Sequence, residues 1–114
     1  MREQNQKRIY ISGPISGHDF EERRAAFKRV QNMLEAQGYE VFNPMENGLP
    51  AEATTREHMH RDLAEMTRED KPYEAIYLMR RWTHSKGCMV EFEVATSIGL
   101  HVFFEEAGLT ARFI

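Results

Sequence analysis

Glu91 is the residue of this sequence whose surroundings most favour chemistry. It lies in a run with helical periodicity, and its neighbours three and four positions away carry no positive charge: Gly87, Cys88, Val94 and Ala95. A carboxylate buried among small apolar residues loses hydration, which raises its pKa and makes it a candidate catalytic group. The alternative is that Glu91 points to solvent or meets a distant arginine, and the spacing does not choose between the two.

Asp62 is a second candidate carboxylate. It lies between Arg61 and Leu63, beside the apolar face of another predicted helix. Two carboxylates that flank a bound sugar can cleave a glycosidic bond, one as nucleophile or stabiliser and the other as acid. Taken alone, Asp62 is more simply interpreted as an exposed or paired helix residue.

A glycine-containing loop over residues 12–17 follows the first apolar run, with the sequence Ser12-Gly13-Pro14-Ile15-Ser16-Gly17. Glycines let backbone amides approach an anion, and the dipole of a helix that starts just after the loop favours negative charge. The loop lacks both the Lys-Ser/Thr ending of a P-loop and the spacing of the dinucleotide fingerprint. A tight turn from strand to helix is therefore the simpler interpretation of its spacing.

A second segment that could hold an anion precedes Glu91. Ser85 is placed to cap the helix that contains Glu91, and Lys86 with the first free amides of that helix could bind a phosphate. Gly87 would allow a ligand to approach closely.

Other polar residues favour simpler roles. His58 and His60 fall on different helix faces, and His58 with Asp62 lacks a further pair of ligands, so we expect no metal and no cofactor. Cys88 has no marked activating base and is interpreted as a small packing residue. One basic run is interpreted as a solvated helix face: Arg23, Arg24, Lys28 and Arg29.

Short apolar runs alternate with helical patterns along the chain. Strands are predicted at residues 9–11, 39–42, 75–79 and 101–104, with a tail at 107–114 that could add an edge strand. Helices are predicted between them: one from the Asp19/Glu22 capping pattern to Gly38, one from the Thr54/Glu57 pattern to a stop before Pro72, and one over 86–98.

This alternation predicts an α/β fold with a parallel sheet covered on both faces. Ligands of such sheets bind beyond the carboxyl ends of the strands. That rule selects the loops at residues 12–17, 43–54 and 80–87.

The whole-chain properties limit the classes of partner. With 114 residues, 41% of them apolar, we expect one domain over residues 8–114 after a flexible lead-in at 1–7. The net charge of −3 argues against polymeric nucleic acid but leaves a single nucleotide open. The one cysteine fits a reducing, cytoplasmic setting, and no apolar run has the length of a membrane span.

Four motifs in order resemble a known group of proteins. They are the segment from Ile9 to Gly17, the pair Asn43-Pro44, Arg61-Asp62-Leu63, and the pattern Trp82-x-x-Ser85-x-Gly87-x-x-x-Glu91-x-x-x-Ala95. Together they resemble an uncharacterised small group placed beside the nucleoside 2-deoxyribosyltransferases and the deoxynucleoside monophosphate N-glycosidases. The resemblance runs from about residue 8 to residue 104.

The resemblance implies a flavodoxin-like three-layer sandwich with strand order 2-1-3-4 and room for a fifth strand. It also implies that Glu91 attacks the anomeric carbon, that Asp62 assists proton transfer, and that Tyr10 matches the tyrosine of the first strand. A homodimer or larger homo-oligomer, in which a neighbour completes the site, is implied as well. The remaining substrate contacts are expected from Ser12, Gly13, Pro14, Ser16, Gly17, Trp82, Ser85, Lys86 and Gly87.

Three departures from the group leave the substrate open. Arg81 precedes Trp82 where glycine is common, Lys86 stands where arginine is usual, and residues 69–74 form a small insertion. We therefore expect cleavage or transfer of the N-glycosidic bond of a (deoxy)nucleoside or its 5′-monophosphate. The alternatives are a module that senses a nucleotide or an ADP-ribose-like ligand without cleaving it, and a purely structural domain.

Overall fold

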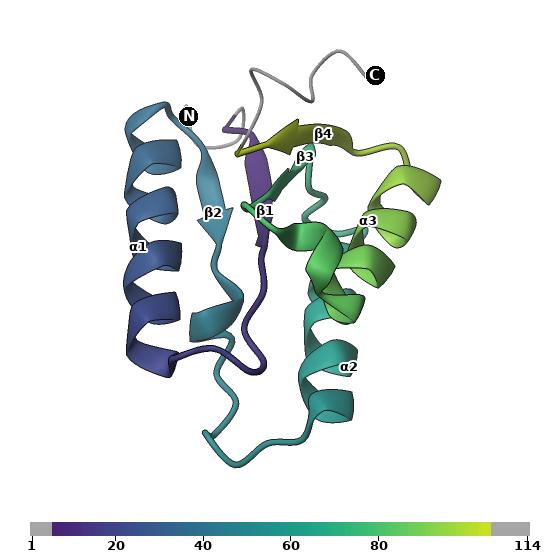
Figure 1. Cartoon of the computed structure of the whole chain (residues 1–114). Coiled ribbons are helices and arrows are strands. Elements are labelled where there is room, and N and C mark those ends of the chain that lie inside the picture. The colour runs from purple at the N-terminus through teal and green to yellow at the C-terminus, as the bar shows by residue number, and fades with distance from the viewer. Residues whose placement is uncertain (1–5, 106–114) are drawn as a thin grey trace.

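A four-stranded, all-parallel sheet forms the centre of the protein (Figure 1). The computed structural model describes residues 6–105, so most of the predicted lead-in and the tail with its possible fifth strand lie outside the described residues. The strands are β1 (Arg8–Ser12), β2 (Glu40–Phe42), β3 (Ala75–Leu78) and β4 (His101–Phe104), in the order β2-β1-β3-β4. This confirms the predicted α/β class and the flavodoxin-like strand order.

Three helices connect the strands: α1 (Phe20–Ala36), α2 (Thr55–Met66) and α3 (Lys86–Ser97), with short 3-10 helices η2 (Pro44–Glu46) and η3 (Trp82–His84). The Asp19 side chain accepts a hydrogen bond from the backbone of Glu22, and Thr54 with Glu57 forms a full capping box, as predicted. Gly38 follows α1 with φ +99, which is the conformation expected of a C-terminal glycine. Five predicted ends differ by one residue, because β1 begins at 8 and ends at 12, β2 begins at 40, β3 ends at 78 and α3 ends at 97.

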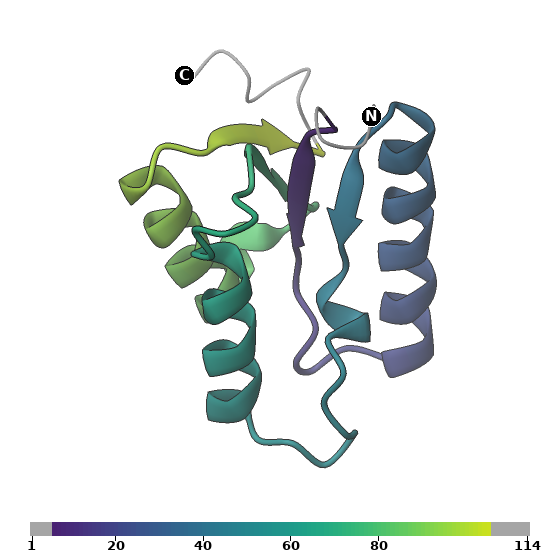
Figure 2. The ribbon, with the colours of Figure 1, turned by 180° about the vertical axis from the view of Figure 1, so that it is seen from behind.

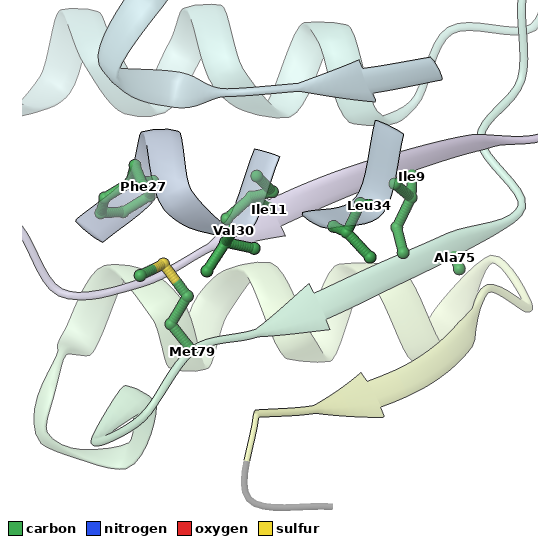
Figure 3. Close-up of a cluster of buried hydrophobic side chains, with 7 residues drawn as sticks. All are labelled: Ile9, Ile11, Phe27, Val30, Leu34, Ala75 and Met79. Carbon is green, nitrogen blue, oxygen red and sulfur yellow. The ribbon is translucent and has the colours of Figure 1, made fainter. Parts of the chain in front are cut away.

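The elements form three layers, with α1 on one face of the sheet and α2 and α3 on the other (Figures 1 and 2). Side chains of a strand alternate between the two faces, so β1 sends Ile9 and Ile11 toward α1 and Tyr10 and Ser12 toward α2 and α3. The core between the sheet and α1 is shown in Figure 3, and its buried residues are Ile9, Ile11, Phe27, Val30, Leu34, Ala75 and Met79.

The strand order reverses between β1 and β3. The chain leaves β1 toward β2 on one side, and β3 pairs with the other side of β1, with Ser12 opposite Leu78. A parallel sheet presents the carboxyl ends of its strands at one edge, and such a reversal is where α/β proteins bind ligands. The fold therefore brings the ends of β1 and β3 together there.

Candidate active site

Glu91 lies in the second turn of α3, with its side chain turned inward against β1. It is 8% exposed, Tyr10 Oη donates to its Oε2 at 2.9 Å, and Ser12 Oγ donates to its Oε1 at 2.5 Å. Tyr10 and Ser12 are two positions apart in one strand, so both hydroxyls emerge on the same face. Each oxygen of the carboxyl group therefore has its own hydroxyl donor, and the side chain is fixed in one orientation.

Burial raises the pKa of Glu91 to about 7, although the hydrogen bonds from Ser12 and Tyr10 act in the opposite direction. The negative charge of Asp62 adds to the rise. The expectation of a desolvated carboxyl group with a raised pKa is confirmed. Burial, together with the charges of Glu91 and Asp62, also raises the pKa of Tyr10, so its phenol keeps the proton that it donates.

Asp62 faces inward from α2 and is 7% exposed, so the interpretation as an exposed helix residue is wrong. Asn47 Nδ2 donates to its Oδ1 at 2.9 Å. Burial raises the pKa of Asp62, against the hydrogen bond from Asn47 and the electrostatic effects of His58 and Arg61.

The negative charge of Asp62 influences the groups around Glu91. The charge of Asp62 acts on both Glu91 and Tyr10, although the three residues come from α2, α3 and β1. Carboxyl groups coupled in this way lose their protons in two steps that belong to the pair. Two buried carboxyl groups that share one proton can supply an acid and an anionic nucleophile at the same pH.

The glycines of the loop at residues 12–17 each have a structural reason. A Cβ on Gly13 would lie 2.6 Å from Met79 Sδ and 3.0 Å from Phe27 Cζ, so only glycine fits there. Gly17 has φ +82 in a turn closed by a hydrogen bond from His18 N to Ile15 O. Pro14 is buried and Ser16 is exposed. Contacts of this loop with a substrate stay a prediction.

The segment before α3 is positioned by packing and capping. Ser85 is the N-cap of α3 as predicted, because its hydroxyl accepts from Cys88 N at 3.2 Å. Trp82 packs against Phe92 and Phe104, with ring centroids 4.9 and 5.9 Å apart. Lys86 is exposed at the first position of the helix. Substrate contacts of Trp82, Ser85 and Lys86 stay predictions.

Gly87 and Arg81, in the same segment, differ in whether the structure favours glycine at their positions. A Cβ on Gly87 would make only an ordinary contact, 3.6 Å from Met59 Cε, so packing does not require glycine there. Arg81 has φ +67, a left-handed conformation that favours glycine.

Three side chains that lie near the candidate site were assigned no part in it from the sequence. Asn47 and His58 surround Asp62, with 3.1 Å between Asn47 Nδ2 and His58 Nδ1. Arg23 was predicted to be solvated, but its side chain is only 11% exposed. Its positive charge acts to lower the pKa of Cys88. A signal existed for Asn47, which lies in a loop selected as a ligand loop, and for Arg23, which is one turn from the buried Phe27.

Other expectations concern chemistry that the site does not use. Cys88 is buried, and burial raises the pKa of its thiol, which fits a packing residue. Within residues 6–105, no group of three or more His, Cys, Asp or Glu side chains is placed to hold a metal ion. None of the helices in this part of the chain has the length and apolar character needed to cross a membrane.

Comparison with known proteins gives one match. Residues 7–104 match the model of a family described as "Domain of unknown function (DUF4406)". No curated protein and no solved structure matches the chain. The matched range begins just before β1 and ends with β4, so it contains every residue of the carboxyl pair and its donors.

Proposed function

This chain belongs to the DUF4406 family, and from its site we propose that it cleaves or transfers the N-glycosidic bond of a (deoxy)nucleoside or its 5′-monophosphate. The observation that carries the proposal is the buried pair Glu91 and Asp62, in which Glu91 has a pKa of about 7 and two hydroxyl donors. The four motifs support it through their resemblance to the uncharacterised group placed beside the nucleoside 2-deoxyribosyltransferases and the deoxynucleoside monophosphate N-glycosidases.

In the first step, the ionised carboxylate of Glu91 forms a bond to C1′ of the sugar as the bond from C1′ to the base nitrogen breaks. The electron pair of that bond leaves with the base, which takes a proton from Asp62. Tyr10 and Ser12 hold the attacking carboxylate in place, and the transition state carries positive charge on the sugar. The products are a free base, a sugar ester of Glu91 and an ionised Asp62.

In the second step, water or a second base attacks C1′ and gives its proton to Asp62. The electron pair of the ester bond returns to Glu91, so both carboxyl groups regain their starting state. Water gives hydrolysis, and a second base gives transfer. Both outcomes use the same residues, and the reaction requires no cofactor.

The protonation state follows from the coupled pair. Catalysis requires one proton, held by Asp62, and one negative charge, held by Glu91. Burial raises the pKa of both groups, to about 7 for Glu91 against the hydrogen bonds from Ser12 and Tyr10, so the reactive form is the share of the singly protonated pair in which the proton lies on Asp62. We assign the remaining substrate contacts to Lys86, the amides at the start of α3, and the loop at residues 12–17.

A second candidate function is binding of a nucleotide or an ADP-ribose-like ligand without cleavage. One observation favours it: a Glu91 with a pKa of about 7 is largely protonated in slightly acidic solution and would then hydrogen-bond a ligand without attacking it. Calorimetry separates the two functions. Tight binding of an intact nucleotide with no product formed would favour the sensing module.

The direct test is incubation of the purified protein with deoxynucleosides, ribonucleosides and their 5′-monophosphates, with chromatographic detection of free base. We expect release from at least one of them and loss of release in Glu91→Gln, which keeps size and shape. Glu93→Gln is the matched control, because Glu93 is an exposed residue of the same helix. Absence of free base with every compound, or undiminished release by Glu91→Gln, would contradict the proposal.

A further inference from the structure

Asn47 is a buried amide held between two side chains of α2. It directly follows η2 and is 6% exposed, and its Nδ2 lies 2.9 Å from Asp62 Oδ1 and 3.1 Å from His58 Nδ1. His58 and Asp62 are four positions apart and share one face of α2. One amide therefore contacts both of them.

The backbone fixes which way this amide points. Asn47 Oδ1 accepts a hydrogen bond from Leu49 N at 3.1 Å, and a backbone N–H can only donate. The oxygen must therefore face Leu49, and the Nδ2 group with its two hydrogens must face α2. Arg61 Nε donates to the carbonyl oxygen of Asn47 at 3.2 Å and ties the residue to the same helix.

This orientation determines where protons sit on the two neighbours. An Nδ2 group only donates, so both atoms that it faces must accept. His58 Nδ1 then carries the lone pair, and its ring proton is on Nε2. Asp62 Oδ1 accepts as well, so the proton of the neutral acid is on Oδ2.

We propose that Asn47 is a positioning residue for Asp62. Its Nδ2 group occupies Oδ1 of Asp62 and so directs the proton on Oδ2 of Asp62 toward the leaving base. This inference rests on the proposed function, in which Asp62 is the acid. A neutral amide suits the task, because an arginine or lysine in its place would favour the ionised carboxylate and remove the proton. Without the amide, the carboxyl group could rotate, and proton transfer depends on correct orientation.

Asn47→Asp tests the donor while it keeps the size of the side chain. The new carboxylate still accepts from Leu49 N, but it places an oxygen where Nδ2 faced Asp62. We expect kcat to fall by about 10- to 100-fold, with KM changed by less than about threefold. Gln31→Glu is the matched control: Gln31 is a partly buried amide of α1, on the other face of the sheet, that accepts from Asn43 and donates to Glu35. Its kcat should stay within about twofold of the wild type.

A double-mutant cycle separates positioning from a general structural effect. If Asn47 acts through Asp62, adding Asn47→Ala to Asp62→Asn should lower kcat no further than Asp62→Asn alone. Independent, additive losses in the double variant would overturn the inference, as would wild-type kcat in Asn47→Asp.

NMR of the histidine ring nitrogens tests the geometry without a substrate. In the wild type we expect His58 to carry its proton on Nε2, with Nδ1 unprotonated, and in Asn47→Asp we expect a proton on Nδ1, facing the new carboxylate. A proton on Nδ1 in the wild type would overturn the inference by itself. An inactive wild type would instead overturn the proposed function, and full activity in Asn47→Asp would overturn the positioning role alone.

Discussion

Glu65 and Glu91 are equally buried carboxyl groups, 7% and 8% exposed, with opposite surroundings. Burial raises the pKa of Glu65, but the hydrogen bonds from Tyr73 and Arg61, the charge of Arg68 and the hydrogen bond from Arg8 outweigh it and the pKa is lowered. Glu91 has hydroxyl donors instead of cations, and its pKa is raised. The first arrangement stabilises a fixed charge, and the second keeps a proton available near neutral pH. This difference is the reason for proposing Glu91, and not Glu65, as the nucleophile.

The raised pKa of Glu91 makes folding stability depend on pH. The folded protein keeps this proton up to about pH 7, whereas the unfolded chain loses it near pH 4.5. Stability should therefore fall as pH rises through this window, by about 3 kcal/mol in total. Glu91→Gln cannot lose this proton, so its stability should not decrease in this way between about pH 4.5 and pH 7. The variant should therefore be more stable than the wild type above pH 7. Urea unfolding across the range measures it.

Glu93→Gln is the control for this experiment, since it removes an exposed carboxylate from the same helix. It should follow the wild-type curve. A Glu91→Gln variant that keeps the full pH dependence would show that Glu91 titrates normally.

The coupled pair also predicts the pH profile of activity. The pair carries one proton in the pH range between two ionisations. The first has the pKa of Asp62, which is raised above its usual value, and the second has the pKa of about 7 assigned to Glu91. The profile of kcat/KM should therefore be bell-shaped and fall above about pH 7. In Asp62→Asn the weak remaining activity should rise with pH to a plateau, because only ionisation of Glu91 then matters. Wild-type activity that still rises above about pH 8 would contradict the shared proton.

At the scale of elements, β1 is the part on which the core and the site both depend. Ile9 and Ile11 pack toward α1, and Tyr10 and Ser12 hold Glu91 on the opposite face. A shift of one residue in the register of β1 would exchange these two sets. Gly13 directly follows this strand, and a Cβ added there would meet Met79 and Phe27.

Gly13→Ala should therefore destabilise the fold. The added Cβ would lie 2.6 Å from Met79 Sδ and 3.0 Å from Met79 Cβ, so side chains of the core must move. We expect a loss of about 1–3 kcal/mol in the free energy of unfolding, measured in urea. Gly87→Ala is the contrast, because its Cβ would make only a 3.6 Å contact inside a helix, and stability should be unchanged or gain up to about 1 kcal/mol. Equal effects of the two substitutions would contradict the packing argument.

Arg81 joins β3 to η3 with φ +67, and relief of this conformation is testable. Arg81→Gly should stabilise the protein by up to about 1 kcal/mol, because glycine adopts positive φ without a steric cost. Thr83→Gly, in the adjacent exposed turn, should instead lose about 0.5–1 kcal/mol through the entropy of the unfolded chain. Thermal unfolding of the two variants would show the opposite signs. Destabilisation by both would indicate that Arg81 has a stabilising contact of its own.

At the scale of the whole molecule, we expect self-association into a homodimer or larger homo-oligomer. Met89 and Val90 are adjacent apolar residues of α3 close to Glu91, and they are 47% and 43% exposed, so they are candidates for the surface where two copies meet. Sedimentation equilibrium should give a mass at least twice that of the chain. Val90→Glu should lower it, and a monomeric wild type at high concentration would contradict the expectation.

The sequence by itself determined the elements and their order. Capping residues, glycines and apolar periods are local signals, so α1, α2, α3 and the four strands are predicted within a residue or two at the ends that the signals mark. The lack of cations around Glu91 was also visible along its helix, but the spacing left open whether its side chain is buried. These features depend on residues within about one turn of each other, whose spacing along the sequence determines whether they are in contact.

Only the tertiary structure decided which polar groups meet. Tyr10 and Ser12 are about 80 positions from Glu91, with separations of 81 and 79, and the contact of Asn47 with Asp62 joins a loop to a helix. It also showed that Arg23 is largely buried and that Gly13 is required by Met79. Contacts between distant segments depend on how the layers pack, and no local period records them. The chemistry of this protein therefore follows from its residue types, and its geometry from the way β1, α2 and α3 come together.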